Sequence, residues 1–128
     1  MADKKILIAD DEIHIVRVLV IKLKNNGYDV ISAENGQQAF ELAQKEKPDI
    51  IVTDYQMPIM TGLELIEKLR ETDQTKDIPV IMLTARSFAI EKQQEQSLRI
   101  SKCLSKPFSP KELLSTVESV LCDSAVNT

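Results

Sequence analysis

Three aspartates, one threonine and one lysine each stand where an apolar run of the chain ends. Asp10 and Asp11 follow "KKILIA", Asp54 follows "DIIVT", Thr84 follows "PVIML" and Lys106 follows "KCLS". Two carboxylates about 4 Å apart repel by roughly 4 kcal/mol at an effective dielectric of 20. Three such groups therefore need a cation, or one of them must be protonated.

A hard divalent ion with oxygen ligands, Mg²⁺ above all, would neutralise such a cluster of carboxylates. It would also neutralise an incoming phosphoryl group. One carboxylate could then act as a nucleophile and form an acyl phosphate, while the hydroxyl and the ammonium bind the remaining phosphoryl oxygens. This chemistry requires that the five side chains meet in space.

The apolar runs that precede these side chains predict five strands. Ile50–Val52 and Val80–Leu83 are continuous apolar runs, which indicates strands buried on both faces, as in a parallel sheet covered by helices. The predicted strands cover 5–10, 29–34, 49–54, 79–85 and 102–106.

Amphipathic segments between the strands predict five helices. These cover about 12–26, from Gly36 to before Pro48, from Thr61 onward, 86–99, and from Ser109 onward. Thr61 and Glu64 form a capping box, and Ser109 with Glu112 forms a second one around Pro110. The first helix is expected to bury the stripe Ile13, Val16, Leu19, Val20 and Leu23. The 86–99 segment has few apolar positions and is expected to be loosely held.

This alternation predicts an α/β fold, a (βα)5 doubly wound five-stranded parallel sheet in a three-layer sandwich with right-handed crossovers. We expect one domain over 1–128, with a core of about 4–122 and a disordered tail at 123–128. With strand order 2-1-3-4-5, the first and third strands are neighbours. Ligand sites in such sheets form at the carboxyl ends of the strands, so the five side chains converge on one rim.

Each of the five residues also has an ordinary explanation when it is taken alone. Asp10 and Asp11 could cap the following helix, and Asp54 could be a turn acid. Thr84 could be a β-branched strand residue, and Lys106 a solvated lysine. None of these explanations accounts for all five lying at the same end of the sheet.

Composition excludes several other classes of protein. The net charge is −4 and no basic block occurs, which argues against direct nucleic-acid binding by this chain. No signal-peptide pattern and no apolar stretch of about 18 residues is present, so we expect no membrane segment. Cys103 and Cys122 fit thiols in a reducing compartment, and we expect a cytoplasmic protein without zinc.

Four motifs occur in an order and spacing typical of one family. They are "ILIADDE", "IIVTDYQMPIMTG", "IPVIMLTA" and "LSKPF", and the match that they anchor covers residues 4 to about 122. With them the chain resembles the receiver domain of two-component response regulators, which have a CheY-like, flavodoxin-like fold. The resemblance implies a phosphoprotein that accepts a phosphoryl group and changes conformation.

The resemblance also assigns roles to the residues around the acceptor. Asp54 is the implied phosphoacceptor. Asp11 is implied to bind Mg²⁺ directly and Asp10 mainly through water, with Asp54 and the backbone carbonyl of Gln56 completing the protein ligands. Thr84 and Lys106 are implied to bind phosphoryl oxygens.

Further positions are implied to switch the domain or to tune the lifetime of the phosphoryl group. Pro107 is implied to follow a cis peptide bond, which a bare X–Pro expectation of about 5–6% does not predict. Gln56, Ala85 and Arg86 lie beside the acceptor and the threonine. Cys103 stands where receivers usually carry Tyr or Phe, which predicts a switch that is weak or that uses the 86–99 helix.

Two other departures from the family pattern lie close to Cys103. Arg99 stands where the family often has glycine, and Ile100-Ser101-Lys102 replace a frequent Ala-Asp-Asp run. All three departures fall on the usual output side. The implied partners are a sensor histidine kinase or phosphotransfer protein and an output protein or domain. Homodimers through 86–99, 102–106 and the last helix are also implied.

Two alternative functions remain open at the level of sequence. The first is a Mg²⁺-dependent phosphohydrolase with an aspartyl nucleophile. Such enzymes generally have a second acid two residues after the nucleophile, where this chain has Gln56, and a cap domain for which 128 residues leave no room. The second is a binding module that never takes phosphate. The leading expectation is a regulator that catalyses only its own phosphotransfer and dephosphorylation, either alone or as part of a longer protein.

Overall fold

A computed structural model describes residues 4–85 and 96–126 of the chain. Five strands form one parallel sheet, in the order β2-β1-β3-β4-β5. The strands are β1 (Lys5–Ala9), β2 (Asp29–Ala33), β3 (Ile50–Asp54), β4 (Val80–Ala85) and β5 (Lys102–Lys106). The predicted α/β fold and strand order are therefore confirmed.

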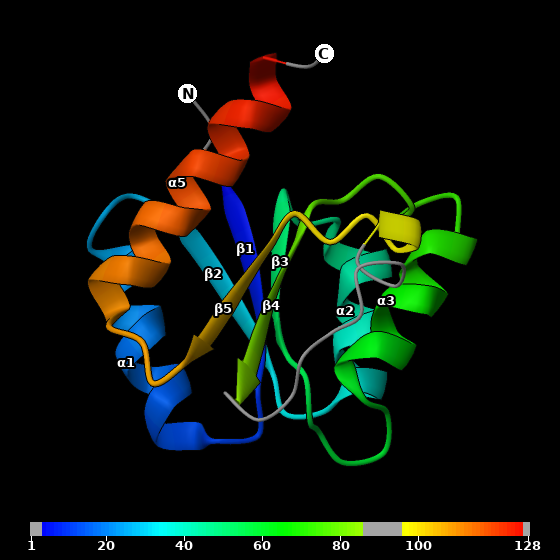
Figure 1. The fold of residues 1–128 in the computed structure, drawn as a ribbon, viewed down its shortest axis with the longest axis horizontal. Helices are drawn as coiled ribbons and strands as arrows, with labels where there is room; N and C mark the ends of the chain where they lie inside the picture. Colours follow the sequence, from blue (N-terminus) through cyan, green and yellow to red (C-terminus); the bar gives the residue numbers. More distant parts are fainter. Residues whose placement is uncertain (1–3, 86–95, 127–128) are drawn as a thin grey trace.

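Within residues 4–85 and 96–126, four helices cover the sheet, and Figure 1 shows α1 and α5 on one face and α2 and α3 on the other. Their bounds are α1 (Ile13–Lys24), α2 (Gly36–Glu46), α3 (Gly62–Glu71) and α5 (Pro110–Val126). The backbone of α5 continues to Val126, past the expected end of the core at residue 122, since neither glycine nor proline interrupts it. The helix predicted over 86–99 lies outside the described residues, except for its last four positions.

The core consists of two apolar layers, one on each face of the sheet. Leu7 and Ile51 contribute to the layer under α2 and α3, whereas Ile6 and Ile8 contribute to the layer under α1 and α5. Successive side chains of a strand point to opposite faces, so a strand buried on both faces needs a continuous apolar run. This explains why β1, β3 and β4 do not alternate in sequence.

Several predicted helix signals are present in the structure. The Thr61 side chain accepts from the Glu64 amide and Glu64 accepts from the Thr61 amide, which confirms the capping box. Ser109 Oγ accepts from the Glu112 amide at 3.0 Å. Ile13 was expected in the core, and this is wrong: it is 53% exposed. It is the first residue of α1, where the chain has just left the edge of the sheet.

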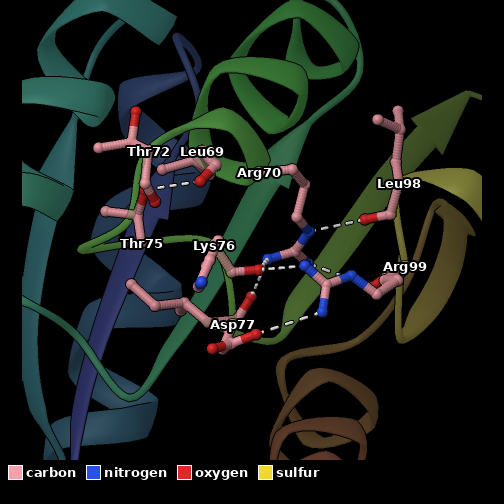
Figure 2. Close-up of polar contacts among 9 residues, drawn as sticks. Leu69, Arg70, Thr72, Thr75, Lys76, Asp77, Leu98 and Arg99 are labelled. Carbon is pink, nitrogen blue, oxygen red and sulfur yellow. Dashed lines mark hydrogen bonds and ion pairs between the residues drawn. The ribbon is translucent and has the colours of Figure 1, made fainter.

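An arginine near the end of α3 contacts both the turn that follows α3 and a second turn, just before β5, that is distant in sequence (Figure 2). Arg70 donates hydrogen bonds to the carbonyls of Leu98 at 2.7 Å, Lys76 at 2.9 Å, Ile78 at 2.7 Å and Arg99 at 3.2 Å. These contacts attach the α3–β4 turn to the segment that leads into β5. They therefore help to hold the strand that carries Lys106.

The loop between β3 and α3 packs closely against the backbone of Asp54, the predicted acceptor. The Gly62 amide donates to the carbonyl of Tyr55 at 2.9 Å, and a Cβ at Gly62 would collide with the backbone carbonyl of Asp54. Met57 and Met60 are buried beneath the loop. Glycine is therefore required at position 62, because the start of α3 lies directly against the backbone of Asp54.

Ile59, at the tip of this loop, has an unfavourable backbone conformation. Its φ is 71°, and the Met60 amide donates to the carbonyl of Pro58 at 2.7 Å across it, as in a rare and strained three-residue turn. A β-branched residue at positive φ is an outlier. The side chain is 79% exposed, so little burial offsets the strain.

We expect Ile59→Gly to increase the free energy of unfolding by about 1 kcal/mol, because glycine adopts positive φ without a Cβ clash. Urea unfolding of the two proteins measures this difference. Ile59→Val is the matched control, since it keeps the β-branch and should leave stability within about 0.5 kcal/mol. A loss of stability in the glycine variant would show that Ile59 makes a stabilising contact.

None of the described helices combines the length and apolar character that a bilayer crossing requires.

Candidate functional site

The register of the sheet brings the predicted side chains to one rim. Ala9 of β1 pairs with Thr53 of β3, so the next residues, Asp10 and Asp54, lie next to each other at the ends of the two strands. Asp54, the predicted acceptor, pairs with Leu83 of β4, and Ala85 pairs with Lys106 of β5. Four adjacent strands therefore end together at the predicted site.

Lys106 lies at the centre of this group. Its Nζ is 2.9 Å from Glu12 Oε1, 3.2 Å from Asp54 Oδ1 and 3.4 Å from Asp10 Oδ2. The explanation of Lys106 as a solvated lysine is therefore wrong, because its side chain is only 19% exposed and is surrounded by three acids.

Asp10 is buried, with a residue exposure of 1%. Its Oδ1 accepts from the Glu12 amide at 3.0 Å, and α1 is preceded by Glu12 without any side-chain cap. The explanation of Asp10 as a helix cap is therefore wrong. Burial raises the pKa of Asp10, partly offset by the Glu12 amide and by the charge of Lys106.

Asp54 is 7% exposed and lies at the last position of β3. Burial raises its pKa to about 6, and the negative charge of Asp10 adds to this effect. Lys106 acts in the opposite direction without cancelling it. An ionised carboxylate at this position destabilises the metal-free fold, whereas an ordinary exposed acid in a turn would not.

Opposing effects also act on Lys106. Burial alone would lower its pKa, but the hydrogen bond to Glu12 and the charges of Asp10 and Asp54 outweigh burial and raise it. The ammonium is therefore charged at physiological pH, where it can bind an anionic group.

Three carboxylates could hold a metal ion. Oxygens of Asp10, Glu12 and Asp54 all lie within 4.8 Å of one another. One ammonium cannot neutralise three ionised acids, so this set of hard oxygen donors fits a hard divalent cation such as Mg²⁺.

The composition of this group differs from the predicted ligand set. Asp11 is exposed and is not among the three grouped acids, and Gln56 is exposed in the loop after β3. Glu12 is present instead and was not predicted. The run Asp10-Asp11-Glu12 was a usable signal, since three consecutive acids at a strand end place at least one extra carboxylate near the rim.

The remaining predicted residues that the structure describes lie on β4, on β5 and directly after β5. Thr84 is buried, follows Leu83 in β4 and pairs with Ser105 of β5. The Lys106–Pro107 peptide bond is cis, as the resemblance implies. Cys103 is exposed on β5. Ala85 is the last residue of β4. Arg86 lies outside the described residues.

Comparison with known proteins gives the family. The family model of the response regulator receiver domain matches residues 6–118. The chain is 40% identical over 124 residues to the alkaline phosphatase synthesis transcriptional regulatory protein PhoP of Bacillus subtilis. This match covers 97% of the chain and 51% of the relative. The chain thus spans about half the length of the curated relatives it matches.

Solved structures agree with this result. The chemotaxis response regulator CheY4 of Vibrio cholerae superposes with a TM-score of 0.85 at 36% identity, covering 93% of this chain and 99% of that one. The receiver domain of sensor histidine kinase PA1611 from Pseudomonas aeruginosa, with a magnesium ion coordinated in its active-site cleft, superposes with a TM-score of 0.83. It is 25% identical, and the match covers 94% of this chain and 98% of that one. This chain therefore belongs to the family of response-regulator receiver domains.

Proposed function

We propose that this chain takes a phosphoryl group on Asp54 from a histidine kinase or phosphotransfer protein, and that the change of charge controls an output protein or domain. The observation that carries the proposal is the position of Asp54. It lies at a strand end, with Lys106 3.2 Å away and two further acids around it. A site with several acids can accept an anionic group only if positive charge is present in the site or arrives together with the group.

The chemistry is an in-line displacement. An ionised oxygen of Asp54 attacks the phosphorus of a phosphohistidine, the P–N bond breaks, and its electron pair leaves with the imidazole of the donor. Lys106 binds one phosphoryl oxygen through its ammonium. Thr84, close to the end of the neighbouring strand, donates a hydrogen bond from its hydroxyl to another phosphoryl oxygen. This contact couples the new charge to β4 and β5.

Asp10, Asp11, Asp54 and the carbonyl of Gln56 are the residues that would hold Mg²⁺ in this chain. When bound, the ion neutralises the carboxylates and the phosphoryl oxygens. Support comes from the grouped oxygens of Asp10 and Asp54. It also comes from the magnesium ion in the receiver domain of PA1611, a relative of the same fold.

Incubation with Mg²⁺ and acetyl phosphate tests the proposal. We expect one phosphoryl group per chain by mass spectrometry, no label on Asp54→Asn, and slow loss of the label after the donor is removed. Labelling that survives Asp54→Asn unchanged would contradict the assignment. Turnover of many phosphomonoesters per chain would favour a phosphohydrolase, and absence of any label would favour a binding module.

We expect Lys106→Ala to leave Mg²⁺ binding intact while it impairs the response to phosphorylation. Removal of the ammonium takes a positive charge away from the acids, so Mg²⁺ affinity should stay equal or rise. The phosphoryl group loses an oxygen ligand, so the spectral change that follows phosphorylation should shrink at least several-fold. Calorimetric Mg²⁺ titration and NMR spectra of the phosphorylated variant measure both. Equal loss of the two would rule out this role.

A further inference from the structure

We propose that Glu12 is a positioning residue that holds the ammonium of Lys106 in the unphosphorylated chain and must release it when Asp54 is phosphorylated. The second half of this inference rests on the proposed function. Glu12 is not among the residues to which the resemblance assigns a role, and the inference comes from the contacts around Lys106.

Glu12 makes the shortest of the three ion pairs. Its Oε1 lies 2.9 Å from Lys106 Nζ, compared with 3.2 Å for Asp54 and 3.4 Å for Asp10. Glu12 is also the outermost partner, because its side chain is 54% exposed whereas those of Asp54 and Asp10 are 10% and 0% exposed. Its backbone is held by the bond from its amide to Asp10 Oδ1.

A phosphoryl group on Asp54 competes with Glu12 for the same ammonium. The group adds anionic oxygens to Asp54, whose Oδ1 lies 3.2 Å from the Lys106 Nζ that Glu12 also contacts at 2.9 Å. The side chain of Asp10 is 0% exposed, so leaving it unpaired is unfavourable. An exposed carboxylate returns to water at small loss, because exposed ion pairs contribute little. Glu12 is therefore the partner that gives way.

Affinity for beryllofluoride, a non-covalent analogue of the phosphoryl group, tests this in the presence of saturating Mg²⁺. We expect Glu12→Gln to bind the analogue about 3- to 10-fold more tightly, because Lys106 is already released. Glu12→Asp keeps the charge but is one methylene shorter, so it should lose the contact and behave like the glutamine variant. Glu34→Gln is the matched control, because Glu34 is an exposed acid just after β2 on the same edge of the sheet, and it should leave affinity unchanged.

The double substitution separates a direct contact from a general effect of charge. In a Lys106→Met background, the Glu12→Gln effect should fall to less than about 2-fold. A persistent effect there, together with wild-type affinity in Glu12→Asp, would overturn the proposal, since charge alone would then explain the result.

The ion pair can also be tested without any phosphoryl analogue. The ammonium of Lys106 should give a protected ¹H–¹⁵N signal at low temperature in the wild-type chain, weakened in both Glu12 variants. An unchanged signal in both would overturn the first half of the inference. If wild type shows the protected signal but does not bind beryllofluoride, the proposed function is wrong. The release step is then wrong as well, whereas the contact between Glu12 and Lys106 stands.

Discussion

Asp54→Asn should stabilise the metal-free protein at pH 7.5 by about 1–3 kcal/mol, although it removes the proposed phosphoacceptor. The pKa of Asp54 is raised from 3.8 to about 6 by burial and by the charge of Asp10. One pKa unit corresponds to about 1.4 kcal/mol, so the ionised carboxylate destabilises the fold by at most about 3 kcal/mol. Asparagine has a similar shape and no charge, so it relieves this penalty.

The stabilisation should depend on pH with a definite sign. A carboxyl whose pKa is higher in the folded chain than in the unfolded chain binds protons more tightly when folded. Its penalty is fully present above about pH 6 and disappears as the pH falls toward 3.8. The difference between Asp54→Asn and wild type should therefore be largest at pH 7.5 and small near pH 4.

Urea unfolding in EDTA at the two pH values measures this difference, and a ¹³C NMR titration of the Asp54 carboxyl measures its pKa directly. Asp73→Asn is the matched control, since Asp73 is an exposed acid in the α3–β4 turn and should change stability by less than about 0.5 kcal/mol. Equal stability of Asp54→Asn and wild type at pH 7.5 would mean that Lys106 fully compensates the charge.

Saturating Mg²⁺ should reverse the order of stability. An ion that binds only the folded chain stabilises it by mass action. Under the proposed function, wild type keeps the Asp54 carboxylate among the Mg²⁺ ligands and should therefore gain more than the variant does. The acid would then be unfavourable for the metal-free fold and favourable for the metal-bound site, as expected for a residue kept for its chemistry.

The layout of the sheet could be predicted because it follows from local patterns. Continuous runs such as Ile50–Val52 indicate strands buried on both faces, and alternation with amphipathic segments then leaves few topologies. The ends of the elements were less predictable. Asp10 lies just beyond β1, where its amide donates to the carbonyl of Ala33, and this contact depends on the neighbouring strand.

Side-chain partners far apart in sequence could not be predicted. Glu12 and Lys106 meet across 94 positions, and the pattern of the chain specifies their rim but not the rotamers that join them. Arg70 looked like an ordinary basic residue in the last turn of a helix, where it complements the helix dipole. Its partners are backbone carbonyls, which leave no trace in sequence.

One departure from the family pattern has a physical account in the structure. Arg99 stands where glycine is frequent, and its φ is 55°, a conformation that glycine adopts readily. Its side chain bonds to the carbonyl of Lys76 at 2.6 Å and pairs with Asp77 at 3.3 Å. These contacts offset part of the strain and connect the turn before β5 to the α3–β4 turn.

Arg70→Met should lower the free energy of unfolding by about 3 kcal/mol, or roughly 10–15 °C in Tm. Methionine keeps much of the aliphatic stem but removes the Arg70 donor from the carbonyls of Leu98 and Ile78, while the Lys76 carbonyl keeps its bond from Arg99. Burial lowers the pKa of Arg70 to about 10, so the guanidinium remains charged and donates charge-assisted bonds at neutral pH. Thermal and urea unfolding measure the loss.

Arg99→Met is the matched control within the same cluster, because the Arg99 side chain is 55% exposed and that of its ion-pair partner Asp77 is 77% exposed. Exposed pairs contribute at most about 1 kcal/mol, so this variant should lose far less stability than Arg70→Met. Hydrogen exchange should separate the two further. The Ser101 amide, which donates to the carbonyl of Val80, should exchange faster in Arg70→Met because the segment leading into β5 is no longer held. Similar losses in both variants would show that the cluster acts through surface charge, and β5 would then owe its position to the sheet alone.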